Sequence, residues 1–552
     1  MSDLKDIKPN EEKLLNSEAA GSRMVKGATI LAVCGIICKV LGAVFRIPLT
    51  NLIGAEGMSY YGVVYPIYSL FLILSTAGFP VAISRMVSGR IALGDYKNAH
   101  RTFKISMYLM LAIGAVSFII CFFGAGAFAK AVGNPGAAMS LRAISPALLF
   151  APVVASLRGY FQGQQNMTPT GVSQVFEQMI RVGVGLTLSF VLVKYSLEYA
   201  SAGATFGASA GLMLALVVLA VIYSKGKAER AAKIQASDTE EEDRGSLIKE
   251  LINIAIPITI GSSIMPLMMI IDSFVIMNRL QATGWSLAMS KTLYGLISGY
   301  CDPLVNFPVV FIDAISISLL PAVTAAFTLH NKEDLNKNVQ AGIKTMMVVA
   351  YPCAIGLIVL ARPILYMLYP TQLEEAELAV HSLQIFSIGI ITLGTMRTFS
   401  SSLQGVGRMY LPVCNLFIGA LAKIVISYTL VGIPALNING AAIGSVSAYL
   451  IAALLNFRAL RKYADVRIDV AGTFVKPLIA SGIMGIVTYA VYRLLNNSMG
   501  HSAVAVLISM MVAVLVYFVL VFKTGTINRE DAKLIPKGDL LMKLAEKAHL
   551  IK

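Results

Sequence analysis

Charged residues are scarce in this sequence: Asp, Glu, Lys and Arg make up only 14% of its 552 residues, whereas 57% are hydrophobic. Its mean hydropathy of +0.73 is far above that of soluble domains. This composition excludes a water-soluble fold. Apolar runs of about 20 residues, the length of one helical crossing of a bilayer, recur along the chain and predict a multi-pass protein of the cell membrane.

Residues that support catalysis or metal binding are also few. The five histidines are scattered, and the six cysteines all fall in apolar segments without the spacing of metal ligands. No Gly-rich loop followed by Lys-Ser or Lys-Thr is present to cradle a phosphate. The sequence therefore predicts a transporter and not an enzyme, with no metal or other cofactor and no ATP hydrolysis by this chain.

The formal net charge of +15 does not indicate nucleic-acid binding. Most of the basic residues lie at the termini and in the even-numbered connections between apolar runs, where cytoplasmic loops carry them. This distribution predicts that both termini are cytoplasmic. The tail after residue 523 spaces leucines among lysines, which suits either an amphipathic helix on anionic lipid headgroups or a solvated basic tail.

The apolar runs predict an all-α polytopic membrane protein with fourteen transmembrane helices, arranged as two pseudo-symmetric six-helix lobes plus two C-terminal helices. The first two helices are expected near 28–50 and 60–84, the third near 104–130 and the ninth near 341–362. The predicted parts are an N-terminal tail (1–27), an N-lobe (28–224), a charged linker (225–249), a C-lobe (250–461), a final helix pair (470–523) and a basic tail (524–552).

An internal repeat at an offset near 240 residues supports the two lobes. Gln162-Gly163 matches Gln404-Gly405, Gly203-Ala-Thr-Phe-Gly matches Gly440-Ala-Ala-Ile-Gly, and the segment from residue 94 to 98 matches 331–336. Because each unit has an even number of helices, both copies enter the membrane from the same side as parallel repeats. This plan is typical of transporters that rock one lobe against the other around a central cavity.

Two basic residues in the first helix are the leading binding candidates. Lys39 and Arg46 are seven residues apart, or two helical turns, so they lie on one face of the helix. A charge inside the hydrocarbon costs at least about 2.5 to 3.5 kcal/mol, so it needs a partner, a water-filled cavity or a function. Either the pair lines a cavity for an anion, or both side chains snorkel to headgroups. Arg85 either joins them or simply marks the cytoplasmic end of the second helix.

Three carboxylates of the second lobe are candidates for ion coupling: Asp272, Asp302 and Asp313. None has a basic neighbour one turn away in its own helix. They could face the cavity and pair with the cations of the first helix, or bind protons or sodium ions. Asp302 ranks first, because Pro303 and Pro308 interrupt the helix beside it and free backbone carbonyls.

Two further sets of intramembrane charges are interpreted as structural. Glu177 and Arg181 are spaced i, i+4 with the acid first, which favours a neutralising pair within one helix. Arg397 and Lys423 in the tenth and eleventh helices are interpreted as structural or snorkelling cations.

Motifs in the first two helices resemble a known family. They are Lys39-Val-Leu-Gly-Ala-Val-Phe-Arg46, Asn51-Leu-Ile-Gly-Ala-Glu-Gly57, Tyr65-Pro-Ile-Tyr-Ser and Ser75-Thr-Ala-Gly-Phe-Pro-Val-Ala-Ile-Ser-Arg85. They are similar to the polysaccharide branch of the multidrug/oligosaccharidyl-lipid/polysaccharide (MOP) exporter superfamily, and within it to the group of lipid II flippases that contains MurJ and stage V sporulation protein B.

The resemblance implies a flippase that moves a polyprenyl-diphosphate-linked peptidoglycan precursor to the outer leaflet for cell-wall biosynthesis. It implies substrate binding by Lys39, Arg46, Asn51, Arg85, Asp302 and Asn306, and a groove for the lipid tail at the last two helices. The family's Asp-Arg followed by Glu in helix 8 falls on Asp302, Pro303 and Asn306. This chain therefore keeps the Asp of the family motif but not its Arg or Glu. For this reason the resemblance does not indicate whether transport is coupled to Na⁺, to H⁺ or to the membrane potential.

Rival functions remain open on the sequence alone. The substrate is either lipid II or another polyprenyl-linked glycan of teichoic acid, capsule or spore cortex. A cation-coupled multidrug exporter would instead need an acidic first helix, and here that helix is basic. A scaffold that binds cell-wall synthesis proteins would leave the buried cations unexplained.

Overall fold

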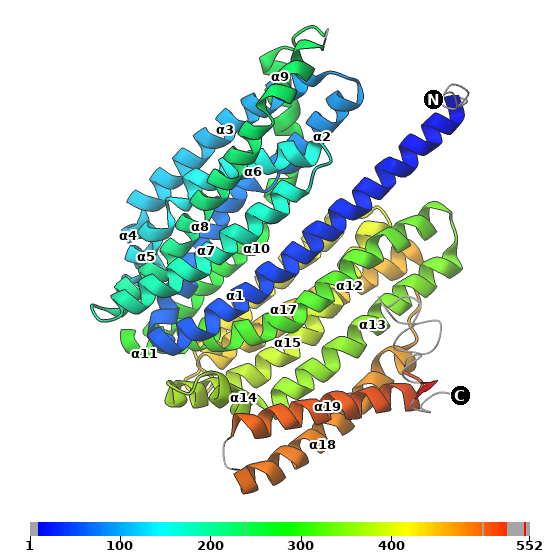
Figure 1. Cartoon of the computed structure of the whole chain (residues 1–552). Helices are drawn as coiled ribbons and strands as arrows, with labels where there is room; N and C mark the ends of the chain where they lie inside the picture. Colours follow the sequence, from blue (N-terminus) through cyan, green and yellow to red (C-terminus); the bar gives the residue numbers. More distant parts are fainter. Residues whose placement is uncertain (1–8, 238, 500–501, 527–545, 548–552) are drawn as a thin grey trace. The chain divides into compact units, whose positions relative to one another are not determined.

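A computed structural model describes residues 9–237, 239–499, 502–526 and 546–547, and within these ranges the chain is helical without any β-strand (Figure 1). Thirteen helical segments of this part are long and apolar enough to cross a membrane. The first of them, Thr29–Ala92, spans 64 residues and contains both of the first two predicted helices. The observed segments therefore confirm the all-α polytopic plan.

The chain divides into two compact units. Unit 1 comprises Met1–Ile53 and Val63–Ile270, and unit 2 comprises Gly54–Gly62 and Ile271–Lys552. The boundaries fall inside two long helices, so a short stretch of the first helix packs with unit 2. The lobes at 28–224 and 250–461 were defined by sequence similarity, a different criterion from compactness, and they stay a prediction.

Unit 1 contains most of the first ten helices. They are α1 (Pro9–Thr76, apart from Gly54–Gly62), α2 (Phe79–Ala92), α3 (Tyr96–Phe123), α4 (Ala125–Ala131), α5 (Ala137–Ile144), α6 (Ala147–Gly163), α7 (Thr168–Leu192), α8 (Leu197–Lys225), α9 (Lys227–Gln235) and α10 (Arg244–Ala282) as far as residue 270. Helix α7 packs along α8, and α2 and α3 both pack on α6.

Unit 2 contains the remaining helices. They are α11 (Leu287–Gly295), the π-helical η1 (Leu296–Cys301), α12 (Asp302–Thr328), α13 (Lys332–Val359), α14 (Ala361–Leu368), α15 (Leu373–Gly405), α16 (Tyr410–Val431), α17 (Asn439–Ala464), the π-helical η2 (Ala471–Val475), α18 (Lys476–Met499) and α19 (Ala503–Lys523). Helix α15 packs against α12, α13 and α17, whereas α18 pairs with α19 and contacts α13.

The repeated glycines predicted from the sequence lie at close helix contacts. Gly207 and Gly211 of α8 face α7 so closely that a Cβ atom at either would lie 2.5 Å from a backbone oxygen, that of Arg181 or that of Glu177. In unit 2, Gly440 of α17 meets the α16 backbone in the same way. Small residues let membrane helices approach backbone to backbone, and this contact sets the position of the charged residues of α7.

Several helix ends differ from the prediction. α3 starts at Tyr96 and not near 104, and α13 starts at Lys332 and not near 341, because Asp95 and Asn331 cap their first turns. Hydropathy detects only the apolar part of such helices. α1 starts at Pro9, within the predicted tail, and continues through the predicted break at 51–59 except at Gly54, whose φ of 61° interrupts the helix.

Candidate functional site

A group of charged residues lies inside unit 1, on α1, α6 and α7. Arg181 of α7 donates a hydrogen bond to the hydroxyl of Tyr65 at 2.7 Å, and its guanidinium lies 5.3 Å from the centre of that ring. The charges of Arg46 and Glu177 also act on the hydroxyl of the half-buried Tyr65. Glu177 forms an ion pair with Arg158 of α6 at 2.9 Å. We call Arg46, Tyr65, Arg158, Glu177 and Arg181 the unit 1 basic cluster.

The basic cluster contains three arginines and one glutamate, so its charge is positive. The side chains of Arg158 and Glu177 are only 16% and 22% exposed. Cations held this way inside an apolar helix bundle attract anions, since the low dielectric around them strengthens the interaction. Arginine forks also match the paired oxygens of a phosphate. The cluster can therefore hold a phosphate-bearing group.

Glu177 and Arg181, the predicted structural pair, each have a partner on another helix. The partners are Arg158 for Glu177 and Tyr65 for Arg181, and direct pairing of Glu177 with Arg181 stays a prediction. Sequence analysis missed Arg158 and Tyr65, because neither is spaced at one helical turn from its partner. Tyr65 did belong to a quoted motif, and that was the available signal.

The other predicted residues of unit 1 lie around the cluster or apart from it. Lys39 is an exposed residue of α1, two turns or about 10 Å along the helix from the half-buried Arg46. The carboxamide of Asn51 donates to the backbone oxygen of Ile47 of its own helix at 3.0 Å. Arg85 is an exposed residue of α2. Their roles in substrate binding stay predictions.

A second charged group lies inside unit 2. Lys423 of α16, only 8% exposed, forms an ion pair with Asp272 of α10. Arg397 of α15 forms an ion pair with Asp313 of α12. The charges of Lys423, Asp272, Arg397 and Asp302 all act on the hydroxyl of the half-buried Tyr449. This arrangement agrees with a structural role for Arg397 and Lys423, although Lys423 is too deeply buried to snorkel.

Two of the three ion-coupling candidates thus have basic partners on other helices of their own unit. A carboxylate that is ion-paired with a lysine or arginine offers less free charge to a sodium ion or proton. The third candidate, Asp302, begins α12 directly after the π-helical η1, with Pro303 next to it. Short π-helical turns are frequent at functional sites. Ion coupling stays a prediction for all three.

An apolar groove lies between the final helix pair and α12 to α14. It has a volume of about 640 Å³ and is lined almost entirely by apolar side chains, among them Leu304, Phe307, Leu357, Val514 and Phe518. The hydroxyl of Tyr517 in its wall donates to the backbone oxygen of Val348 at 2.7 Å. Such a groove suits a hydrocarbon chain.

The groove adjoins two of the predicted binding residues in sequence. Leu304 and Phe307 line it from the first turns of α12, the same turns that carry Asp302 and the exposed Asn306. Polar and apolar binding groups therefore share one segment of α12.

Comparison with known proteins places these features in a family. The model of the family described as "Polysaccharide biosynthesis protein" matches residues 24–327, and the model described as MatE matches residues 297–429. The chain is similar to lipid II flippase MurJ of Bacillus subtilis, at 28% identity over 93% of this chain and 98% of that one. It is also similar to stage V sporulation protein B of the same organism, at 25% identity over 82% and 86%.

A solved structure has the same fold. The inward closed conformation of lipid II flippase MurJ superposes with a TM-score of 0.67 at 15% identity, covering 89% of this chain and 98% of that one. These matches confirm the predicted resemblance and the MOP fold. The chain belongs to the polysaccharide biosynthesis protein family, and it is a multi-pass membrane transporter of the MurJ-like flippase type and not an enzyme.

Proposed function

We propose that this protein is a flippase for the lipid-linked peptidoglycan precursor lipid II. It moves the precursor from the cytoplasmic to the outer leaflet by alternating access, with both termini in the cytoplasm. The observation that carries the proposal is the basic cluster of unit 1. Three half-buried arginines inside a helix bundle are costly in a membrane protein unless they bind something, and a diphosphate is the part of a lipid-linked glycan that would need them.

The apolar groove of unit 2 supports the same substrate class. A polyprenyl tail cannot enter a polar cavity at low cost, so a flippase needs a lateral apolar surface along which the tail travels. The groove beside α18 and α19 offers one, and its volume of about 640 Å³ accommodates several isoprene units. A water-soluble solute would need no such surface.

Another polyprenyl-diphosphate-linked glycan is the second candidate, because the basic cluster and the groove recognise the diphosphate and the tail and not the sugars. The similarity to stage V sporulation protein B favours a precursor of spore cortex within this class. Multidrug export is disfavoured, since a cationic drug would be repelled by the positive cluster.

The test is complementation of a flippase-depleted strain by variants of α1. Lys39→Ala and Arg46→Ala should abolish growth while membrane abundance stays normal. Lys130→Ala, at an exposed position of α4, removes the same charge elsewhere and should complement fully. Intact complementation by both α1 variants would refute the anion-binding role of this helix.

The substrate is identified by measuring which lipid-linked glycan becomes accessible at the outer leaflet. Depletion of the protein should lower the accessible lipid II. If accessible lipid II stays unchanged while another polyprenyl-linked glycan falls, the second candidate is correct.

A further inference from the structure

Each unit contains a turn between two helices, and the two turns have the same backbone geometry. In unit 1 the turn joins α2 to α3: Gly94 has a φ of 78°, and the N–H of Asp95 donates to the oxygen of Arg90 at 2.9 Å. In unit 2 the turn joins α12 to α13: His330 has a φ of 54°, and the N–H of Asn331 donates to the oxygen of Ala326 at 3.0 Å. Both turns end in a side chain that caps the next helix.

This geometry pairs the residues of the two turns. Gly94 corresponds to His330, Asp95 to Asn331 and Arg90 to Ala326. This alignment is shifted by one position from the sequence match, which placed residue 94 over residue 331. The turns are therefore equivalent places in the two repeats, and what covers each of them can be compared.

In unit 1 an acidic segment covers the turn. Residues 239–243, here called the acidic strap, run without regular structure along the start of α3. The buried carboxamide of Asn98 holds the strap backbone, donating to the oxygen of Glu240 at 2.7 Å and accepting from the N–H of Glu242 at 3.0 Å. The hydroxyl of Thr239 donates to Asp95 at 2.7 Å.

The carboxylates of the strap neutralise the basic residues around this turn. Glu242 forms an ion pair with Arg90 at 2.6 Å, and Glu241 forms ion pairs with Arg101 and, at 3.6 Å, with Lys97. At the α2–α3 turn, basic residues of two helices thus bind anionic groups, and these anionic groups are carboxylates of the same chain.

In unit 2 the equivalent turn lacks such a cover within the described residues. After α17 the chain passes straight to η2, and its backbone is held further along α13: the N–H of Arg467 donates to Asn336 at 2.9 Å, and Gln340 donates to the oxygen of Arg467 at 2.6 Å. A pocket of about 390 Å³ remains at the turn. Ala326 and Asn331, the counterparts of the strap-contacting Arg90 and Asp95, line it together with His330.

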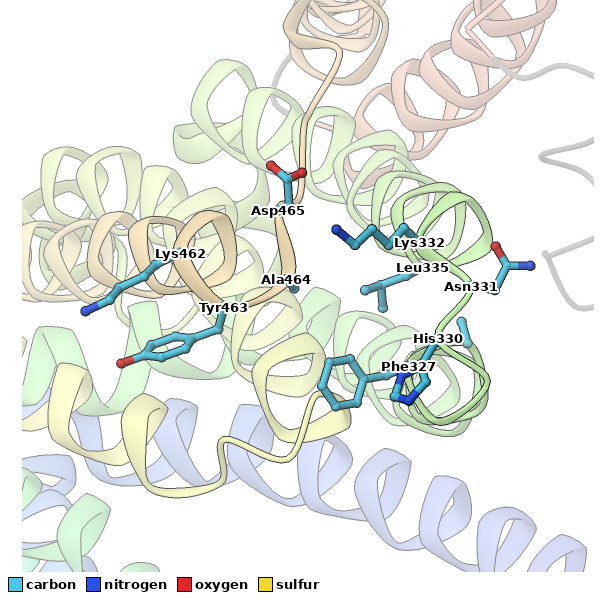
Figure 2. Close-up of a pocket in the computed structure, with 10 residues that line it drawn as sticks. Phe327, His330, Asn331, Lys332, Leu335, Lys462, Tyr463, Ala464 and Asp465 are labelled. Carbon is cyan, nitrogen blue, oxygen red and sulfur yellow. The ribbon is translucent and has the colours of Figure 1, made fainter.

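Figure 2 shows how this helix-end pocket is built. Lys332 lies on α13, Lys462 and Tyr463 lie at the end of α17, Phe327 lies at the end of α12, and His330 lies in the turn that follows α12. One carboxylate, that of Asp465, also lines it. The guanidinium of Arg408 lies 4.3 Å from the centre of the Tyr463 ring, and the ammonium of Lys462 lies 5.3 Å from it. Cations therefore outnumber the acid here.

Exposed apolar side chains border the pocket. Phe327 in its wall is 37% exposed and the adjacent Leu329 is 78% exposed, as is typical of residues that reach into lipid. Aromatic and basic residues together at helix ends mark the interface between hydrocarbon and water. At that level the abundant anion is the phosphate of a lipid headgroup.

We infer that the helix-end pocket binds the phosphate of an anionic phospholipid headgroup. Lys332 pairs with the phosphate, Lys462 adds positive charge at the edge of the pocket, and Phe327, Leu329 and Tyr463 contact the start of the acyl chains. The lipid then supplies from the membrane the negative charge that the acidic strap supplies in unit 1. This site is separate from the proposed binding of a transported precursor, and its test does not depend on transport.

The experiment measures retained lipid. The full chain is reconstituted in nanodiscs of phosphatidylcholine and phosphatidylglycerol and then extracted into detergent. Native mass spectrometry measures the fraction of the protein that retains bound phosphatidylglycerol. Lys332→Gln and Lys462→Gln should each weaken retention about fivefold, the factor expected for one lysine beside an anionic headgroup. Lys225→Gln/Lys227→Gln, at the end of α8 and the start of α9, is the matched control and should leave retention unchanged.

A variant that is expected to strengthen lipid retention controls for loss of retention through misfolding. Asp465→Asn removes the pocket's carboxylate at a position with a φ of 49°, which asparagine tolerates, and it should strengthen retention. Equal retention by wild type and both lysine variants would overturn the inference. Displacement of the lipid by excess inorganic phosphate, or by a peptide of residues 237–243, would also overturn it, because the pocket would then serve a soluble anion or an acidic peptide.

Discussion

The carboxylate of Glu375 accepts a hydrogen bond from the backbone N–H of Ala55 at 2.6 Å, although the two residues are 320 positions apart. The same carboxylate accepts from the hydroxyl of Tyr300 at 2.5 Å. Ala55 follows Gly54, where α1 is interrupted, so its N–H begins a new helical segment and needs an acceptor. Glu375 thereby holds the Gly54–Gly62 stretch of α1 within unit 2.

Glu375→Ala should therefore destabilise the protein. Losing the acceptor leaves the N–H of Ala55 and the hydroxyl of the buried Tyr300 without this partner, which costs about 1 to 3 kcal/mol each when no water replaces it. Thermal unfolding in detergent measures the effect. The neighbouring Glu374 is exposed, and Glu374→Ala should leave the unfolding temperature unchanged. Equal shifts for both variants would show that Glu375 has no special role.

Gly54→Ala should destabilise the same junction for a different reason. Gly54 has a φ of 61° and a ψ of −171°, a backbone region that is essentially confined to glycine and costs another residue about 1 to 3 kcal/mol. An added Cβ would also lie 3.2 Å from both carboxylate oxygens of Glu375. Gly89→Ala is the control, since Gly89 is helical and an added Cβ there meets open space. It should be neutral or stabilising. An equally stable Gly54→Ala protein would contradict the assigned backbone conformation.

Asp272→Asn should lower the free energy of unfolding by about 3 to 5 kcal/mol, because it leaves the buried ammonium of Lys423 without its charge partner. The double variant Asp272→Leu/Lys423→Met removes both charges and should recover most of that loss. Chemical denaturation of the purified protein compares the two. If the double variant is less stable than Asp272→Asn, the ion pair does not account for the loss.

The stability contributed by Asp95 should disappear at low pH. Burial works to raise the pKa of this carboxyl, but hydrogen bonds from Asn98 and Thr239 and the charge of Arg90 outweigh it and hold the pKa below its ordinary value of 3.8. A lowered pKa in the folded state stabilises the protein above pH 3.8 and stops doing so as the pH falls through the folded value.

The measurement for Asp95 compares the unfolding of wild type and Asp95→Ala over pH. At neutral pH the variant should be less stable by about 1 kcal/mol, the usual cost of losing an N-cap. The difference should shrink below pH 3.8. A difference that is constant down to pH 3 or so would contradict the ionised cap.

The sequence by itself determined the solvent and the helical elements. Apolar runs near 20 residues have only one stable form in a bilayer, the helix, because every backbone group must be hydrogen-bonded within the segment. The motifs around Arg46 indicated the family. Each of these signals is local, so no knowledge of distant residues was needed.

Tertiary structure alone decided which charges meet. Lys423 pairs with Asp272, 151 positions away, and Arg158 pairs with Glu177 across two helices. The groove beside α18 and α19 likewise combines walls from α12 to α14. These partners depend on how helix faces pack and on which separate segments become neighbours. Because many packings bury equal apolar surface in one sequence, periodicity along a single helix cannot choose among them.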